Sequence, residues 1–457
     1  MINFIWTDPL NSNKNRLFNF HTENQIIKKS KLSLKSQEKW REIPLNKKIN
    51  SFKALLNILE KNKNKYASLM AQEMGKPVNQ GLQEIEKCIS LCDFYLKNSV
   101  SFLKSKKFEF DKNRGFVTFQ PLGVILGIMP WNFPFWQVFR FAIPALLSGN
   151  TVLLKHSLCV PSCAEIIDQI FSKLDTPKNI FQNIRLSNQN TNDLIKKSSI
   201  SAVSFTGSTN AGMLVAQTSG AALKKVVLEL GGNDPYLIFS DAKLDNAVQS
   251  CIEGRLLNAG QSCISAKRII VLDDIYEKFL EKVINNLKQK TVGDPISNID
   301  MGPLVSIQAR DKVDHQVQLS IKSGAKLLMG GAIKNKNSAF YPITVLSEVL
   351  PGMVAFDEEI FGPVFSITRA KNEKEAIELA NLSEYGLGAS IFTQNIKKAE
   401  EIAKLKLDVG MCYINDFVKS DPRLPFGGVK NSGFGRELSI NGILEFANVK
   451  TIVNNNN

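Results

Sequence analysis

Residues 124–155 read VILGIMPWNFPFWQVFRFAIPALLSGNTVLLK, and this stretch decides the fold class. It opens with a short apolar run, Val124–Met129, and closes with a second one, Thr151–Lys155. Runs of this length and composition are typical of strands that are buried on both faces of a parallel sheet. The apolar segment from about residue 136 to residue 147 predicts a helix between the two strands. The stretch therefore predicts an α/β domain.

The same alternation continues along the chain. Further strands are expected at 202–205 and 226–228, with a helix at 210–219 between them, which favours a doubly wound sheet. A second α/β region is expected after Gly231-Gly232. Its first elements are predicted at 245–258 (helix), 268–272 (strand) and 276–288 (helix). We expect the first hundred residues to be helical, residues 115–121 to form an extended ribbon, and residues 446–453 to form a strand.

Length and composition limit the classes of protein to consider. The chain has 457 residues, enough for roughly three domains. No apolar stretch approaches the ~20 residues needed to span a bilayer, and the N-terminus lacks a secretory signal. We therefore expect a cytoplasmic protein with no membrane partner. The net charge of +14 comes from lysines spread along the whole chain, without a nucleic-acid-binding motif, so we expect no nucleic-acid partner.

The seven cysteines form no CxxC pair, and the three histidines are scattered. This spacing predicts no metal site and no disulfide framework. Most of the thiols are expected to be small buried side chains. A catalytic role must therefore be argued for one cysteine at a time.

Two segments follow predicted strands, at the edge where α/β sheets bind ligands. In Phe205–Gly212, a glycine turn leads into a helix whose free N–H groups suit a phosphate, although an ordinary strand-to-helix turn would look the same. In Pro130–Pro134, two prolines stiffen a loop that carries Asn132, whose amide either donates to a ligand or stabilises the turn.

Two residues have the chemistry of a catalyst. Glu229 directly follows an apolar strand, where burial would raise its pKa and suit it to general-base catalysis, although a surface position is the commoner one. Cys263 follows Gly260-Gln261-Ser262. A cysteine sulfur can attack an aldehyde carbon to give a thiohemiacetal, which loses hydride and leaves a thioester that water can hydrolyse.

Five segments together resemble the aldehyde dehydrogenase superfamily, and the resemblance covers nearly the whole chain. They are Pro130–Pro134, Leu228–Gly232, Gly260–Cys263, Glu358–Val364 and Pro425–Gly433. One such segment is a moderate signal, whereas five in the family's order are a strong one. The resemblance implies two doubly wound α/β domains, one for the cofactor and one for catalysis, and a small β oligomerisation domain.

The expected domain limits follow from that resemblance. The NAD(P)-binding domain is expected at 1–101 and 121–230, and the catalytic domain at 231–430. The oligomerisation ribbon and C-terminal strand are expected at 102–120 and 431–457. A homodimer or homotetramer is implied.

The resemblance also assigns roles to single residues. Cys263 would be the nucleophile, Asn132 and the Cys263 backbone N–H would form the oxyanion hole, and Glu229 would activate the hydrolytic water. Taken alone, Lys155 would be read as a solvated lysine and Glu359 as a surface carboxylate. The full set of residues implied to bind NAD or NADP is Trp131, Asn132, Lys155, Ser157, Gly207, Ser208, Leu230, Glu359 and Phe361.

Within the superfamily, the chain is similar to bacterial succinate-semialdehyde dehydrogenases. The segments Glu73–Gln80, Leu153–His156 and Ser432–Ser439 carry this similarity. It implies that Arg140 binds the carboxylate of the substrate, although a structural ion pair would also explain a buried arginine.

One feature departs from that pattern. Some of these enzymes have a second arginine six residues before the nucleophile, where this chain has Leu257. Ser420 or Arg423 is a hypothetical replacement, and Arg255 should face elsewhere. Leu158 stands where NAD-preferring relatives often have a glutamate, so NADP should be tolerated.

Three alternative functions remain open at this stage. The enzyme could oxidise another small aldehyde, or it could transfer the acyl group to CoA, although members of that branch commonly lack the glutamate found here as Glu229. Outside enzymes, the same scaffold could be a catalytically silent binding protein, which the intact Cys263, Glu229 and Asn132 make improbable.

Overall fold

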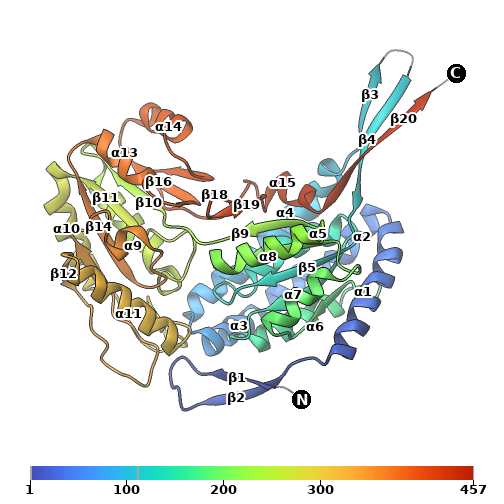
Figure 1. Ribbon diagram of the computed structural model, residues 1–457, viewed down its shortest axis with the longest axis horizontal. Helices are drawn as coiled ribbons and strands as arrows, with labels where there is room; N and C mark the ends of the chain where they lie inside the picture. The colour runs from blue at the N-terminus through green and yellow to red at the C-terminus, as the bar shows by residue number, and fades with distance from the viewer. Residues whose placement is uncertain (1–2, 111–112, 456–457) are drawn as a thin grey trace.

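The computed structural model describes residues 3–110 and 113–455. Residues 1–2, 111–112 and 456–457, which belong to the expected domain ranges, lie outside the described residues. Two α/β lobes lie side by side, and a β-ribbon projects from one of them (Figure 1). The expected class, with two parallel-sheet lobes and a separate β element, is confirmed.

The first lobe is built on a six-stranded sheet in the order β19-β9-β8-β5-β6-β7, in which only β19 runs antiparallel to its neighbour. The chain forms β5, β6 and β7 outward in one direction and then returns to β8 beside β5. Ligands of such sheets bind at the carboxyl ends of the strands where the order reverses. The strands are β5 (Val124–Met129), β6 (Thr151–His156), β7 (Phe181–Asn183), β8 (Ala202–Thr206), β9 (Lys225–Glu229) and β19 (Gly433–Phe434).

Helices cover both faces of this sheet (Figure 1). In β5, Ile125 and Met129 pack into one hydrophobic core, while Val124 and Leu126 pack into another on the opposite face. Because both faces are buried, the whole strand is apolar. The helices of this lobe are α1 (Glu23–Glu42), α2 (Leu45–Phe52), α3 (Ala54–Met74), α4 (Val78–Phe102), α5 (Trp136–Leu147), α6 (Pro161–Ser172), α7 (Asn188–Lys196), α8 (Thr209–Ala221) and α15 (Ser439–Glu445).

The second lobe contains a seven-stranded sheet in the order β12-β13-β14-β11-β10-β16-β17, with only β12 antiparallel. Its strands are β10 (Pro235–Ile238), β11 (Arg268–Leu272), β12 (Lys326–Met329), β13 (Thr344–Ser347), β14 (Val364–Ala370), β16 (Gly388–Phe392) and β17 (Met411–Ile414). Its helices are α9 (Leu244–Leu256), the short 3₁₀ helix η1 (Leu257–Gly260), α10 (Asp273–Leu287), α11 (Ile307–Lys322), α12 (Val354–Asp357), α13 (Glu373–Asn381) and α14 (Ile396–Leu405).

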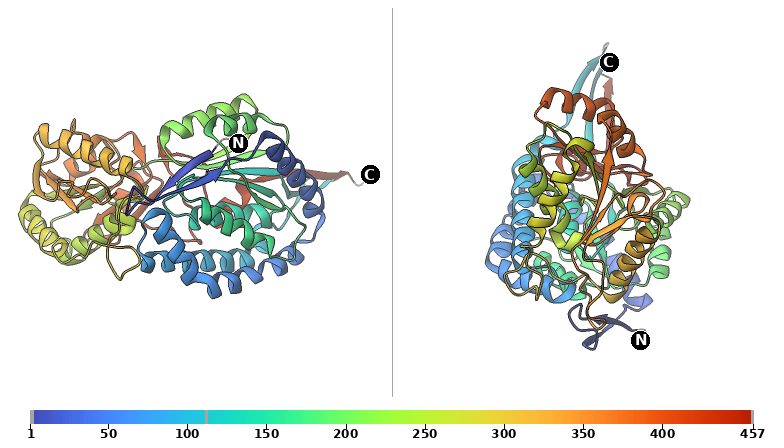
Figure 2. Two further views of the ribbon diagram at one scale, coloured as in Figure 1. Left: turned by 90° about the horizontal axis from the view of Figure 1, so that it is seen from below. Right: turned by 90° about the vertical axis from the view of Figure 1, so that its left-hand side faces the viewer.

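Three small β elements complete the fold. A three-stranded antiparallel ribbon in the order β20-β4-β3 stands clear of both lobes in every view (Figures 1 and 2). It consists of β3 (Lys106–Phe110), β4 (Asn113–Pro121) and β20 (Ala447–Asn455). The other two elements are a hairpin of β1 (Asn3–Thr7) and β2 (Asn15–Asn19), and a short pair of β15 (Tyr385–Gly386) and β18 (Val429–Lys430).

Three expectations need correction. The first hundred residues are not all helical, because β1 and β2 pair antiparallel, and the alternation of buried Phe4 and Trp6 with exposed Ile5 has the two-residue period of a strand. The helix expected at 245–258 ends at Leu256. Within the expected ribbon segment 431–457, β19 instead joins the first-lobe sheet and only β20 belongs to the ribbon.

Among the helices that the structure describes, none combines the length and the apolar character needed to cross a bilayer.

Candidate active site

Cys263 lies just after a tight turn at the end of α9. Three successive residues in this turn, Asn258, Ala259 and Gly260, have left-handed φ values of 54°, 55° and 74°. Such backbone costs non-glycine residues on the order of 1 kcal/mol or more each, and it recurs at functional sites. A Cβ on Gly260 would lie 2.2 Å from the Gly362 carbonyl oxygen. The turn is therefore held tightly against its neighbour, and this fixes the start of the loop that carries Cys263.

Cys263 lines a cavity of about 230 Å³. The cavity has aromatic walls and contains three cationic side chains, Lys87, Arg140 and Lys419. The aromatic residues are Phe133, Trp136, Phe417 and Phe426. A thiol, apolar walls and positive charge in one enclosed space suit a small organic substrate with an anionic end.

Burial raises the pKa of the Cys263 thiol to about 12, while Lys267 opposes the shift. The Lys267 Nζ donates hydrogen bonds to the carbonyl oxygens of Ser262 and Cys263, at 2.8 and 2.6 Å, and lies 3.2 Å from Glu359 Oε1. Sequence analysis did not identify Lys267 as a residue of this site. Its position four residues after Cys263 is the feature that could have identified it.

Asn132 is fixed against the loop that carries Cys263. Its side-chain Nδ2 donates to the Gln261 carbonyl at 3.0 Å, and Asn258 Nδ2 donates to the Asn132 carbonyl at 2.8 Å. Because an amide nitrogen carries two hydrogens, one donor of Asn132 remains uncommitted. Among the described residues the Cys263 backbone N–H also has no acceptor. Two donors are thus free beside the thiol.

Glu229 lies at the end of β9 and is almost completely buried. Neither carboxyl oxygen has a hydrogen-bond partner among the described residues. Burial, followed by repulsion from Glu437, raises the pKa of Glu229 well above its usual value. The side chain lies against Gly427, where an added Cβ would be 2.7 Å from Oε1, and it does not line the Cys263 cavity.

Four of the residues expected to bind the cofactor lie at the ends of β6 and β8, the strands on either side of β5. Lys155 is buried near the end of β6, and Ser157 follows that strand. Burial lowers the pKa of Lys155, and its Nζ has only a long contact, 3.5 Å, to Asn188 Oδ1. Gly207 and Ser208 join β8 to α8. Ser208 caps α8 without a side-chain hydrogen bond, which leaves N–H groups of the first turn for an anion.

The remaining expected cofactor residues lie where the lobes meet. The rings of Trp131, from the first lobe, and Phe361, from the second, lie edge to face with centroids 5.8 Å apart. Glu359 Oε1 accepts a hydrogen bond from the Gly232 N–H at 3.3 Å. Leu230 is buried against Gly212, where a Cβ would lie 2.3 Å from the leucine. Anion donors and the Trp131 ring in one lobe, and the Glu359 carboxylate and the Phe361 ring in the other, fit a dinucleotide that spans both.

Arg140 and Ser420, the two expected substrate contacts, both line the Cys263 cavity. Arg140 is buried, forms an ion pair with Glu437, and places its guanidinium 4.5 Å from the centre of the Phe426 ring. The Ser420 hydroxyl accepts a hydrogen bond from Lys87 Nζ at 2.6 Å. The structural ion pair that the sequence left open for Arg140 is thus present. Glu437 and Lys87 are further residues of this site that sequence reasoning did not identify.

The other arginines considered for the substrate lie elsewhere. Arg255 is buried and donates to the carbonyl oxygens of Val364 and Ile360, at 2.6 and 2.9 Å. Arg423 is largely exposed and pairs with Asp421. Leu257 does line the cavity, as an apolar residue.

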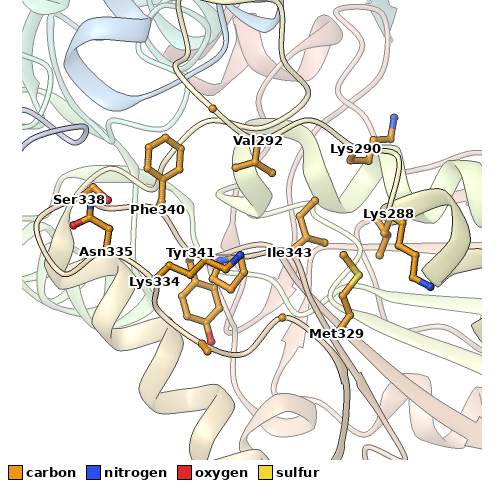
Figure 3. Close-up of a pocket in the computed structure, with 15 residues that line it drawn as sticks. Lys288, Lys290, Val292, Met329, Lys334, Asn335, Ser338, Phe340, Tyr341 and Ile343 are labelled. Atoms are coloured by element: carbon orange, nitrogen blue, oxygen red, sulfur yellow. The ribbon is translucent and has the colours of Figure 1, made fainter.

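A second cavity, of about 680 Å³, lies in the outer part of the second lobe. Lys288 and Lys290 lie on one side of it and Lys334 on the other (Figure 3). No cysteine, histidine or carboxylate occurs among the described residues that line it. It therefore offers no thiol to attack an aldehyde and no carboxylate base, and the Cys263 cavity is the candidate active site.

Comparison with known proteins gives a consistent result. A model of the aldehyde dehydrogenase family matches residues 5–452. A succinate semialdehyde dehydrogenase, NAD(P)+-type by its name, from Escherichia coli is 42% identical over 414 residues, which cover 90% of this chain and 89% of that protein. A probable NADP+ succinate-semialdehyde dehydrogenase from Synechocystis is 39% identical and covers 97% and 98% of the two chains.

A solved structure has the same fold. The succinic semialdehyde dehydrogenase from Streptococcus pyogenes, in complex with NADP+, superposes with a TM-score of 0.94 at 34% identity. The match covers 97% of this chain and 98% of that one.

Proposed function

The chain belongs to the aldehyde dehydrogenase family, and on that premise we propose that it oxidises succinate semialdehyde to succinate with NAD(P)+ as the oxidant. The enzyme class, an NAD(P)-dependent aldehyde dehydrogenase, follows from the family and its relatives. The observation that supports the substrate is the cavity that holds Cys263 together with Lys87 and Arg140. A thiol and cations on the walls of one cavity suit an aldehyde with a carboxylate tail. The names of the relatives agree with this proposal.

In the first half of the reaction, the Cys263 sulfur attacks the aldehyde carbon and its proton passes to a base. The carbonyl oxygen gains negative charge and is stabilised by the free Asn132 amide hydrogen and the Cys263 backbone N–H. Arg140 and Ser420 are our predicted contacts to the tail of the substrate.

When bound, the cofactor would supply the hydride acceptor. The residues that would hold it come from both lobes: Trp131, Lys155, Ser157, Gly207, Ser208 and Leu230 from the first, and Glu359 and Phe361 from the second. The thioester that remains on Cys263 then reacts with water. Glu229 accepts a proton from that water, the carbon–sulfur bond breaks, and the carboxylate product leaves. A carboxyl group with a raised pKa and no committed hydrogen bond suits this role.

Initial rates with three aldehydes test the substrate. They are succinate semialdehyde, its five-carbon homologue glutarate semialdehyde, and uncharged butyraldehyde, each measured with NAD+ and with NADP+. We expect kcat/KM to be highest for succinate semialdehyde and activity to be lost in Cys263→Ser. Equal kcat/KM for butyraldehyde would reject the carboxylate substrate while leaving the enzyme class intact.

We also propose that the protein forms a homodimer or homotetramer. The projecting ribbon supports this, because Phe108 in β3 and Val449 in β20 are at least half exposed. A thin ribbon with apolar side chains gains stability when a second copy covers it.

A further inference from the structure

The three cations of the Cys263 cavity differ in how their charge is balanced. Arg140 is paired with the buried carboxylate of Glu437. Lys419 lies 2.6 Å from Asp416 and is half exposed. Lys87 forms no ion pair within the part of the chain that the structure describes, and its Nζ donates only to the neutral Ser420 hydroxyl. Lys87 is therefore the cation of this cavity whose charge lacks a partner.

The acids near Lys87 are committed to other groups. Glu84, one turn earlier on α4, accepts hydrogen bonds from Lys76 and from the Phe135 backbone N–H at 2.8 Å. Asp421 pairs with Arg423 at 2.6 Å. Neither of these two carboxylates is therefore free to pair with Lys87 if only the Lys87 side chain moves.

The surroundings of this lone cation disfavour its charged form. The pKa of Lys87 is lowered to about 8, mainly by burial and then by repulsion from Arg140. The Trp136 ring, whose centre lies 4.3 Å from Nζ, offsets part of this effect and fixes the position of the ammonium group. A partly buried ammonium group that is held in place beside a hydroxyl is prepared to receive an anion.

We infer that Lys87 and Ser420 together bind the terminal carboxylate of the aldehyde substrate, and that Lys87 is the main source of selectivity for an anionic aldehyde. This inference rests on the proposed function. In it, Ser420 donates its hydroxyl hydrogen to the substrate while accepting from Lys87. The aromatic walls at Trp136 and Phe426 pack against the methylene groups of the substrate. Arg140, whose charge Glu437 balances, remains a further contact to the tail of the substrate and contributes less to the selectivity for its charge.

Lys87→Met tests this inference, because it keeps an unbranched side chain of nearly the same length and removes the charge. We expect KM for succinate semialdehyde to rise by about 10- to 100-fold, the range of a charge-assisted hydrogen bond, with a much smaller change for butyraldehyde. Inhibition by succinate should weaken in parallel. Lys87→Arg should restore part of the selectivity. Lys97→Met, at an exposed position on the same helix, is the matched control.

Two outcomes would overturn the inference. In the first, Lys87→Met, folded by circular dichroism and with an unchanged Tm, keeps the wild-type preference for succinate semialdehyde. In the second, Arg140→Met loses that preference selectively while Lys87→Met does not. If wild-type enzyme itself shows no preference over butyraldehyde, the proposed substrate fails instead, so the two failures are distinguishable.

Discussion

At the scale of single residues, the proposed catalytic pair consists of two acids, Cys263 and Glu229, and burial raises the pKa of both. The pKa of Cys263 is raised to about 12, and that of Glu229 is raised well above its usual value. Each group acts when deprotonated, and a raised pKa moves the deprotonated form to higher pH. For uncharged butyraldehyde, whose binding does not depend on the Lys87 charge, we therefore expect kcat/KM to increase from neutral into alkaline pH. Initial rates with butyraldehyde between about pH 6 and pH 10 check this, and a maximum on the acidic side would contradict it.

Glu229→Gln separates the two halves of the reaction. Glutamine has the same shape but cannot accept a proton from water, so the thioester should accumulate. We expect steady-state turnover to fall by about 10²- to 10⁴-fold, the usual contribution of a general base. A rapid burst of about one NAD(P)H per active site should remain. Stopped-flow absorbance measures both quantities. A variant without a burst would place Glu229 in the activation of Cys263 instead.

At the scale of elements, the turn from α9 through η1 sets the position of the nucleophile. Gly260 has a φ of 74° and no room for a Cβ beside Gly362. Gly260→Ala should displace the loop, lower stability by about 1–2 kcal/mol and reduce kcat by at least about 10-fold. Gly220→Ala in α8 is the control, because nothing lies within 4 Å of an added Cβ there. Thermal unfolding and kcat check both variants, and equal effects would contradict the argument.

Much of the first lobe could be predicted from the sequence, because its strands are short apolar runs buried on both faces. The predicted strand 124–129 and helix 136–147 agree with β5 and α5. The N-terminal hairpin could not be predicted in this way. Its strands have one exposed face, and β2 is mostly exposed, so only pairing with β1 identifies it.

The candidate site shows the same division between local and long-range information. The turn before Cys263 and the loop with Asn132 are local motifs and could be recognised from the sequence. The partner of Arg140 could not, because Glu437 lies far away in the sequence and meets it only in the folded chain. The same holds for Lys87, which reaches Ser420 from α4. Charges in a cavity are balanced by tertiary contacts, so spacing along the chain does not reveal which of them is free.

At the scale of the whole molecule, each lobe contributes different groups to the candidate site. The first lobe contributes anion donors at its strand ends, and the second contributes the thiol, with Glu359 and Lys267 beside it. The ribbon contributes nothing to the Cys263 cavity among the described residues. Its exposed apolar residues support the proposed association between copies.

Phe108→Glu combined with Val449→Glu tests that association. These side chains lie on β3 and β20, and they are 50% and 60% exposed in the single chain. If a second copy covers them, a buried carboxylate in each strand should oppose assembly, at a cost of several kcal/mol per interface. We expect wild-type protein to have the mass of a dimer or tetramer by light scattering after gel filtration, and the variant to have a lower mass. The matched surface variant Leu405→Glu, in the exposed last turn of α14, should keep the wild-type mass.

A monomeric wild type at micromolar concentration would exclude the proposal. A double variant that keeps the wild-type mass would show that assembly uses another surface.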